Sequence, residues 1–86
     1  MPVLSKFYGI IIRMAFCPTT GAHFHATYQE AELVVGLNPL RVIQGDAPSR
    51  VRDLVLEWAR SRYPELLAAW RRCAAAQPAQ PIAPLH

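Results

Sequence analysis

The feature that most constrains the fold of this chain is a change in the spacing of its apolar residues near Pro48. Before Pro48, apolar and polar residues alternate, which is the two-residue period of half-buried strands. After it, apolar residues recur every three or four positions, which is the period of an amphipathic helix. Because hydrophobic residues make up 52% of the 86 residues, both halves can share one core. The change predicts an α+β fold with two layers, in which antiparallel strands precede two helices.

The first half of the chain is predicted to form three strands, at residues 8–16, 23–28 and 31–37, with a loop at 17–22. If a two-residue turn lies at Gln29 and Glu30, the apolar sides of the last two strands meet on one face of the sheet. The predicted apolar side chains are Tyr8, Ile10, Ile12, Met14, Phe16, Phe24, Ala26, Tyr28, Ala31, Leu33 and Val35. Residues 40–44 are a candidate for a fourth strand at the edge of the sheet, which would end at Gly45. The sheet is thus an antiparallel meander of three or four strands.

The second half is predicted to form two helices that cover the apolar face of the sheet. Asp46 or Ala47 is the expected N-cap, with Pro48 in the first turn. Pro64 has no N–H to donate, so the first helix is expected to end near residues 62–63 and a second one to begin there. The predicted apolar stripes comprise Val51, Leu54, Val55, Trp58, Ala59, Leu66, Leu67, Trp70, Cys73 and Ala74.

The chain is predicted to hold one domain, at residues 1–77, and a tail rich in Pro and Ala at 78–86. Ile82 and Leu85 are expected to anchor this tail by packing. A domain of this size hides only about 60–65% of its unfolded surface, so its core is thin. That excludes a multidomain enzyme and disfavours a private cofactor pocket, and we expect no cofactor. A partner that covers surface would add stability.

The uncovered face of the sheet is where we expect functional side chains. His23 and His25 are two residues apart on one strand, so both are predicted to point outward from this face, about 6.5–7 Å apart. Hairpin pairing places Arg13 opposite His25 or one step diagonal to it. Thr27 and Glu32 face each other across the next hairpin and are predicted binding residues. The sequence therefore predicts an exposed cationic cluster of two imidazoles and a guanidinium.

Three interpretations of this cluster stay open. The two histidines could share the acid and base steps of phosphodiester cleavage while Arg13 holds the phosphate, which makes His23, His25 and Arg13 candidate catalytic residues. A His-x-His pair can also supply two metal ligands, but a third, from Glu32 or Cys17, is not at a diagnostic spacing, so no metal ligand is assigned. Finally, a strand histidine is often a surface or interface residue that takes part in no chemistry, and this interpretation includes protein binding through the face.

The basic residues define a second candidate surface. Nine Lys and Arg outnumber six Asp and Glu, giving a net charge of +3. Arg41, Arg50 and Arg52 lie near the start of the first helix. Arg41 and Arg50 are candidate binding residues, since the charge allows contacts to a phosphate-bearing partner such as RNA, with an affinity that falls with salt. The alternative is a solvated helix face on which Glu57 and Glu65 neighbour the arginines. No glycine-rich phosphate loop is present in the sequence.

The expected location is the cytoplasm. No apolar run approaches the about 18 residues of a membrane span, and residues 1–6 lack the apolar core of a secretory signal. Cys17 and Cys73 are too few and too far apart for a disulfide scaffold, and neither lies in a CxxC pair. Both are predicted to be reduced thiols.

Segments along nearly the whole chain resemble the small bacterial DUF4160 domain, a family without an assigned function. The resemblance lies in FYGIIIRM at 7–14, HFHA at 23–26, LVLEWA at 54–59, ELLAAW at 65–70 and PIAPL at 81–85. Gly21 and Ala22 depart from it, because the family usually has two prolines there. The loop at 17–20 also lacks the acidic residue or histidine that the family often has. If that loop helps to build a metal site in the family, the site is weakened in this chain.

The resemblance implies a partner rather than a reaction. Genes of this family tend to lie beside a gene for another small domain, DUF2442, in pairs that look like toxin–antitoxin modules, and this chain would be the toxin-like member. The leading hypothesis is therefore a small cytoplasmic interaction protein that binds an antitoxin-like DUF2442-type partner. The alternatives are a metal-independent ribonuclease-like toxin that uses His23 and His25, and a metal-binding regulatory domain. Self-association into a homo-oligomer is left open.

Overall fold

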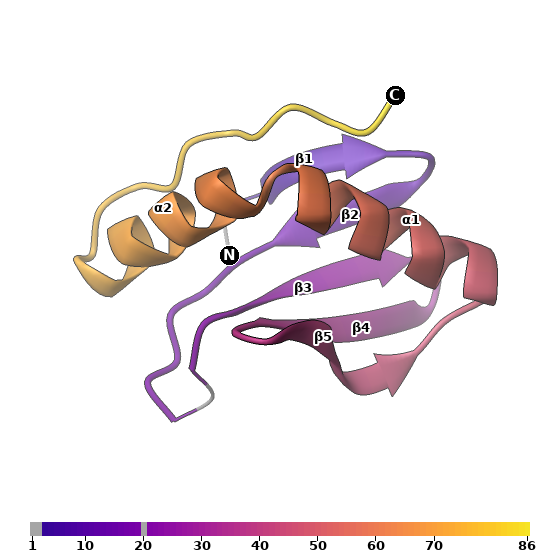
Figure 1. Ribbon diagram of the computed structural model, residues 1–86, viewed down its shortest axis with the longest axis horizontal. Helices are drawn as coiled ribbons and strands as arrows, with labels where there is room; N and C mark the ends of the chain where they lie inside the picture. Colours follow the sequence, from indigo (N-terminus) through magenta and orange to yellow (C-terminus); the bar gives the residue numbers. More distant parts are fainter. Residues whose placement is uncertain (1–2, 20) are drawn as a thin grey trace.

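The computed structural model describes residues 3–19 and 21–86, which form an antiparallel five-stranded sheet and two helices (Figure 1). The elements in chain order are β1 (Val3–Phe7), β2 (Ile10–Arg13), β3 (His23–Tyr28), β4 (Ala31–Leu37), β5 (Leu40–Asp46), α1 (Ser49–Ser61) and α2 (Tyr63–Ala74). Each strand pairs with the next along the chain, so the sheet order is β1-β2-β3-β4-β5. The predicted α+β class and layer order are confirmed, and the sheet has five strands rather than three or four.

The additional strand is β1, which the sequence pattern does not reveal. Tyr8 and Gly9 form the turn between β1 and β2, with φ angles of 50° and 78°. Positive φ at both central residues suits a two-residue hairpin, because the twist of such a turn matches that of the strands. The strand predicted at 8–16 is therefore shortened to β2. Tyr8 and Phe16, predicted on its apolar side, are instead 54% and 46% exposed.

The hairpin predicted between the next two strands is confirmed. Tyr28 pairs with Ala31 around the turn at Gln29, and Phe24 pairs with Val35 further along. Gln29 adopts the left-handed backbone conformation that this turn requires, with a φ of 53°. Since side chains alternate along a strand, this register places Phe24, Ala26, Leu33 and Val35 together on one side of the sheet. The burial of Phe24 and Val35 shows that they face the helices.

The prediction that the last strand ends at Gly45 is wrong, because β5 continues to Asp46. Gly45 has a φ of 90°, and a Cβ at this position would lie 2.1 Å from the carbonyl oxygen of Glu32 on β4. The close approach of the two strands therefore requires glycine. The register of β4 and β5 also shifts between Val34 and Val35. Ile43 is the extra residue of this β-bulge.

Both helices lie across one face of the sheet (Figure 1). The predicted break between them is confirmed: only Arg62 separates α1 from α2, and Pro64 lies in the first turn of α2. The predicted N-cap is wrong. Pro48 takes that position without a side-chain hydrogen bond, while Asp46 Oδ1 accepts the N–H of Ala47 at 2.9 Å. Neither helix in the described ranges combines the length and apolar character that a membrane crossing requires.

The core lies between the helices and the inner face of the sheet. Trp58 of α1 is fully buried, with its ring centroid 5.3 Å from that of Phe7 and 5.8 Å from that of Phe24. Other fully buried side chains are Leu4, Ile10, Ile12, Met14, Leu33, Val35, Leu37, Val55 and Leu66. Tyr28 of β3 and Trp70 of α2 are only partly buried, so the predicted apolar positions do not all contribute equally to the core.

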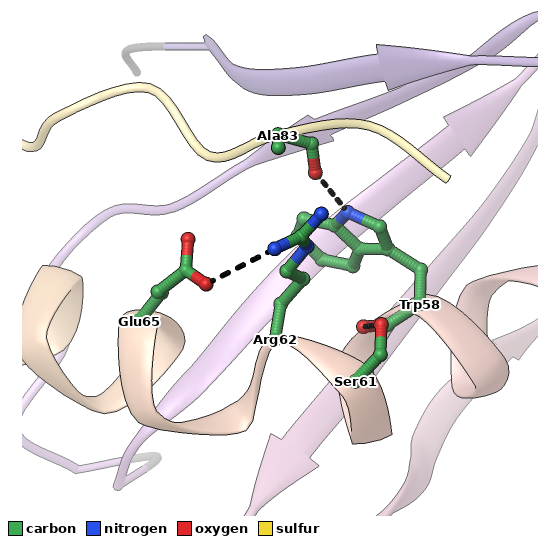
Figure 2. Close-up of polar contacts among 5 residues, drawn as sticks. All are labelled: Trp58, Ser61, Arg62, Glu65 and Ala83. Carbon is green, nitrogen blue, oxygen red and sulfur yellow. Dashed lines mark hydrogen bonds and ion pairs between the residues drawn. The ribbon is translucent and has the colours of Figure 1, made fainter. Parts of the chain in front are cut away.

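The C-terminal tail returns along α2 and runs beside β1 (Figure 1). The N–H of Ile82 donates a hydrogen bond to the carbonyl of Leu4 at 2.8 Å, and the Ile82 side chain is buried. Trp58 Nε1 donates to the carbonyl of Ala83 at 2.9 Å (Figure 2). Leu85 packs against the core. The tail is therefore held at its middle by backbone and side-chain contacts, and it covers the outer edge of β1.

Candidate functional site: the outer sheet face

The outer sheet face is the side of the sheet turned away from α1 and α2. Strand alternation and the pairing register assign to it the side chains of Val3, Lys6, Ile11, Arg13, His23, His25, Thr27, Glu32, Val34, Arg41, Ile43, Gln44 and Asp46. The two helices and the tail all lie on other sides of the sheet (Figure 1). This is the surface on which the sequence analysis expects functional residues.

The structure brings Arg13, His25, Thr27 and Glu32 together at the centre of this face. Arg13 lies directly opposite His25 in the register of β2 and β3, and Thr27 lies opposite Glu32 in that of β3 and β4. His25 Nδ1 is 3.7 Å from Glu32 Oε2, which is an ion-pair distance when His25 is protonated but too long for a hydrogen bond. The predicted pairings across both hairpins are therefore confirmed.

His25 has one buried and one accessible part. Its Nδ1 atom is buried and has no hydrogen-bond partner among the described residues, yet its side chain as a whole is 22% exposed. The rest of the ring is thus the part that a molecule on the outer sheet face can reach. A small rotation of the exposed Glu32 side chain would satisfy the Nδ1 atom, because the two groups are already within ion-pair distance.

His23 lies on the same side of β3 as His25, but it is buried, which contradicts the predicted exposure of this residue. It is only 4% exposed, because Trp70 of α2 packs against its ring at a centroid distance of 5.3 Å. Its Nδ1 lies 2.7 Å from the carbonyl oxygen of Gly21. Since a carbonyl can only accept, Nδ1 donates this bond and carries the proton. His23 meets His25 edge-on at a centroid distance of 5.3 Å, and with 4% exposure it offers little surface to a bound molecule.

Trp70 is the site residue that the sequence analysis places elsewhere, in the core. Its ring contacts Phe16 on one side and His23 on the other, each at a centroid distance of 5.3 Å. These contacts continue through His23 to His25. A row of four rings therefore connects α2 to the outer sheet face. No local signal marks this role, because Trp70 also fits the apolar stripe of its helix.

The two arginines predicted to bind a phosphate-bearing partner lie on different sides of the molecule. Arg41 is exposed on β5, opposite Gly36, and belongs to the outer sheet face. Arg50 is exposed on α1, beside a shallow pocket whose other residues include Asp53 and Glu57. The structure therefore does not bring Arg41 and Arg50 into one site. The acidic neighbours of Arg50 favour the alternative of a solvated helix face.

The residues considered as metal ligands do not converge. Within residues 3–19 and 21–86, no group of three or more His, Cys, Asp or Glu side chains is placed to hold a metal ion. Cys17 Sγ lies 3.3 Å from Thr19 Oγ1 in the loop after β2. The outer sheet face thus offers one accessible imidazole, a guanidinium and a carboxylate, which can bind charged groups.

A family model matches most of the chain. It is that of DUF4160, a domain of unknown function, and it matches residues 9–71. This range contains β2 to β5, α1 and most of α2, so it includes the central residues of the outer sheet face. Neither a curated protein nor a solved structure matches the chain.

Proposed function

The chain belongs to the DUF4160 family, and from that premise we propose that it is a cytoplasmic interaction module that binds a small acidic partner domain through its outer sheet face. In this proposal it is the toxin-like member of a two-gene pair, and the partner is the DUF2442-type protein that the neighbouring gene encodes. Since the family name assigns no activity, the proposal depends on the surface itself.

The observation that carries the proposal is that the outer sheet face combines apolar and charged side chains and has no cover among the described elements. Ile43 is 43% exposed, Ile11 is half-buried, and both lie among charged residues. An interface of a non-obligate complex is typically mixed in this way, with apolar contacts inside a polar rim. The other side of the same sheet is filled by α1 and α2, so only one side can receive a partner.

The charge of the face favours an acidic partner. Arg13 and Arg41 form no ion pair with a described residue, whereas Arg62 on the helical side pairs with Glu65 at 3.4 Å (Figure 2). Lys6, Arg13 and Arg41 outnumber Glu32 and Asp46 on this face. Together with the net charge of +3, the two guanidinium groups would therefore attract an acidic surface and speed its association. The attraction should weaken as salt is added, because both side chains are accessible to solvent.

Co-expression with the product of the neighbouring gene tests the proposal. We expect the two chains to co-elute in size-exclusion chromatography with light scattering, and Arg13→Glu to weaken the complex. Arg60→Glu is the matched control, because Arg60 is exposed on α1, away from the outer sheet face. A chain that elutes alone beside its neighbour's product, or equal losses in the two variants, would contradict the proposal.

A second candidate function, a ribonuclease-like toxin, is favoured by the contact of His25 with Glu32 beside Arg13. With His23 buried, this candidate would use His25 as the general base, Glu32 to orient its ring and Arg13 to hold the phosphate. Induction of the chain alone should then arrest growth, and His25→Ala should abolish the arrest while the purified variant stays folded. Arrest that persists in folded His25→Ala would remove this candidate.

A further inference from the structure

We propose that two copies of this chain pair antiparallel through β5, with Arg41 of each copy against Asp46 of the other. The geometry of β5 alone supports this pairing, which does not depend on the proposed function. The partner of this edge is a second copy of the chain, because the charges of one β5 complement those of another.

β5 is an edge strand with no second neighbour. It pairs with β4 alone, and no backbone hydrogen bond joins it to any other described element. The backbone groups on the far side of such a strand can pair with another strand. The opposite edge of the sheet differs, because the carbonyl of Leu4 on β1 accepts the N–H of Ile82 from the tail.

The β-bulge determines which charges this edge presents. On β4, Glu32 and Gly36 are four residues apart and therefore point to the same side. Their partners on β5, Asp46 and Arg41, are five residues apart, and in a regular strand they would point to opposite sides. Because Ile43 is an extra residue between them, the side chains of Arg41 and Asp46 point to the same side of β5. Arg41 and Asp46 consequently both lie on the outer sheet face, at opposite ends of the exposed edge.

Neither charge is balanced within the described part of one copy. Arg41 lies opposite Gly36, which has no side chain, and Asp46 lies opposite Glu32, which carries the same charge. Like charges that face each other across two strands are unfavourable. Asp46 accepts only the local N–H of Ala47, and neither Arg41 nor Asp46 forms an ion pair with a described residue. The edge thus has an uncompensated cation at one end and two neighbouring carboxylates at the other.

A two-fold antiparallel pair satisfies both ends at once. Symmetry repeats every contact, so a register that places Arg41 against Asp46 makes the pair twice. The same register places Val42 against Gly45, two residues that point to the inner side. It also brings the two copies of Ile43, each 43% exposed in the single chain, beside the symmetry axis on the outer side. The two sheets would then form one continuous sheet.

Sedimentation of the purified full-length chain over a range of concentrations tests this pairing. We expect a reversible dimer, which Arg41→Asp alone or Asp46→Arg alone weakens about tenfold or more, because each change turns two attractive pairs into repulsive ones. Combining the two substitutions should restore the dimer. Asp46→Asn keeps an oxygen acceptor for the Ala47 N–H and separates the loss of charge from the loss of that bond. Arg13→Glu on β2, two strands away, should leave the dimer unchanged.

The outcomes separate this pairing from the proposed function. A chain that stays monomeric up to about 1 mM, a dimer that is insensitive to the single reversals, or a doubly reversed chain that fails to recover would each overturn the pairing. If the chain remains a monomer and yet co-elutes with the product of the neighbouring gene, the pairing is refuted and the proposed function stands. Circular dichroism of each variant shows whether a loss of association is merely a loss of fold.

Discussion

The two edges of the sheet are built in opposite ways. At β1, the edge is covered: the tail runs beside it, Ile82 is buried, and Ala83 accepts a hydrogen bond from the buried Trp58 (Figure 2). At β5, the edge has no second neighbour among the described residues, and most of its side chains are exposed. This sheet can therefore be extended in one direction only. An assembly made through β5 would close as a pair rather than grow into a fibre, because the second edge of each copy is already occupied.

The covered edge should make the larger contribution to stability. Trp58 connects the tail to the core, and its ring is fully buried against Phe7 and Phe24. We therefore expect Trp58→Ala to lower the free energy of unfolding by about 3–5 kcal/mol, measured by urea denaturation. The sequence alone predicts the same loss for Trp70→Ala, but Trp70 is only partly buried, so its loss should be smaller. Equal losses would show that Trp58 and the tail that it contacts contribute less to the free energy of unfolding than their burial indicates.

A direct comparison of the edges uses one isoleucine from each. Ile82 covers β1 and is 6% exposed, whereas Ile43 on β5 is 43% exposed. Ile82→Ala should cost about 2–4 kcal/mol of unfolding free energy, and Ile43→Ala should stay within about 0.5 kcal/mol when the chain is dilute enough to be monomeric. Thermal and urea unfolding of both variants would check this. A reversed order would mean that the tail does not cover β1 in solution.

The open edge requires a residue without a side chain at Gly45. A Cβ there would overlap the carbonyl of Glu32, and the φ of 90° is one that residues with side chains rarely adopt. Gly45→Ala should therefore cost about 1–3 kcal/mol of unfolding free energy. Gly21→Ala is the matched control, because Gly21 also has a positive φ but no neighbouring atom within 4 Å of the added Cβ. If the two variants are equally stable, β4 and β5 do not approach as closely as described.

Alternation along the chain was sufficient to predict the centre of the sheet. It gave the register of β3 and β4 and the position of Arg13 opposite His25, because one face of these strands is apolar throughout. It could not reveal β1, where Leu4 and Ser5 are both buried at a shift in register and a serine occupies a core position. A bulge and a buried hydroxyl together remove the pattern by which a strand is recognised.

The candidate site was predicted in part for a similar reason. Strand alternation correctly assigned His25 to the outer sheet face, but the exposure of His23 depends on Trp70, which is distant in sequence and packs against its ring. Local spacing contains no information on such a contact. The two charges of β5 were likewise hidden, because Arg41 and Asp46 share a face only through the β-bulge, and a bulge cannot be read from the residue pattern of one strand.

Amide hydrogen exchange, followed for each residue at low and at high protein concentration, is the sharpest single test of the difference between the edges. The amide of Ile82 should exchange slowly at both concentrations, because it donates to the carbonyl of Leu4 on β1 within one copy. The outward-pointing amides of β5 should exchange rapidly when the protein is dilute and slowly when it is concentrated. Exchange at β5 that is the same at both concentrations, or exchange at Ile82 that is as rapid as at dilute β5, would contradict the description of one closed and one open edge.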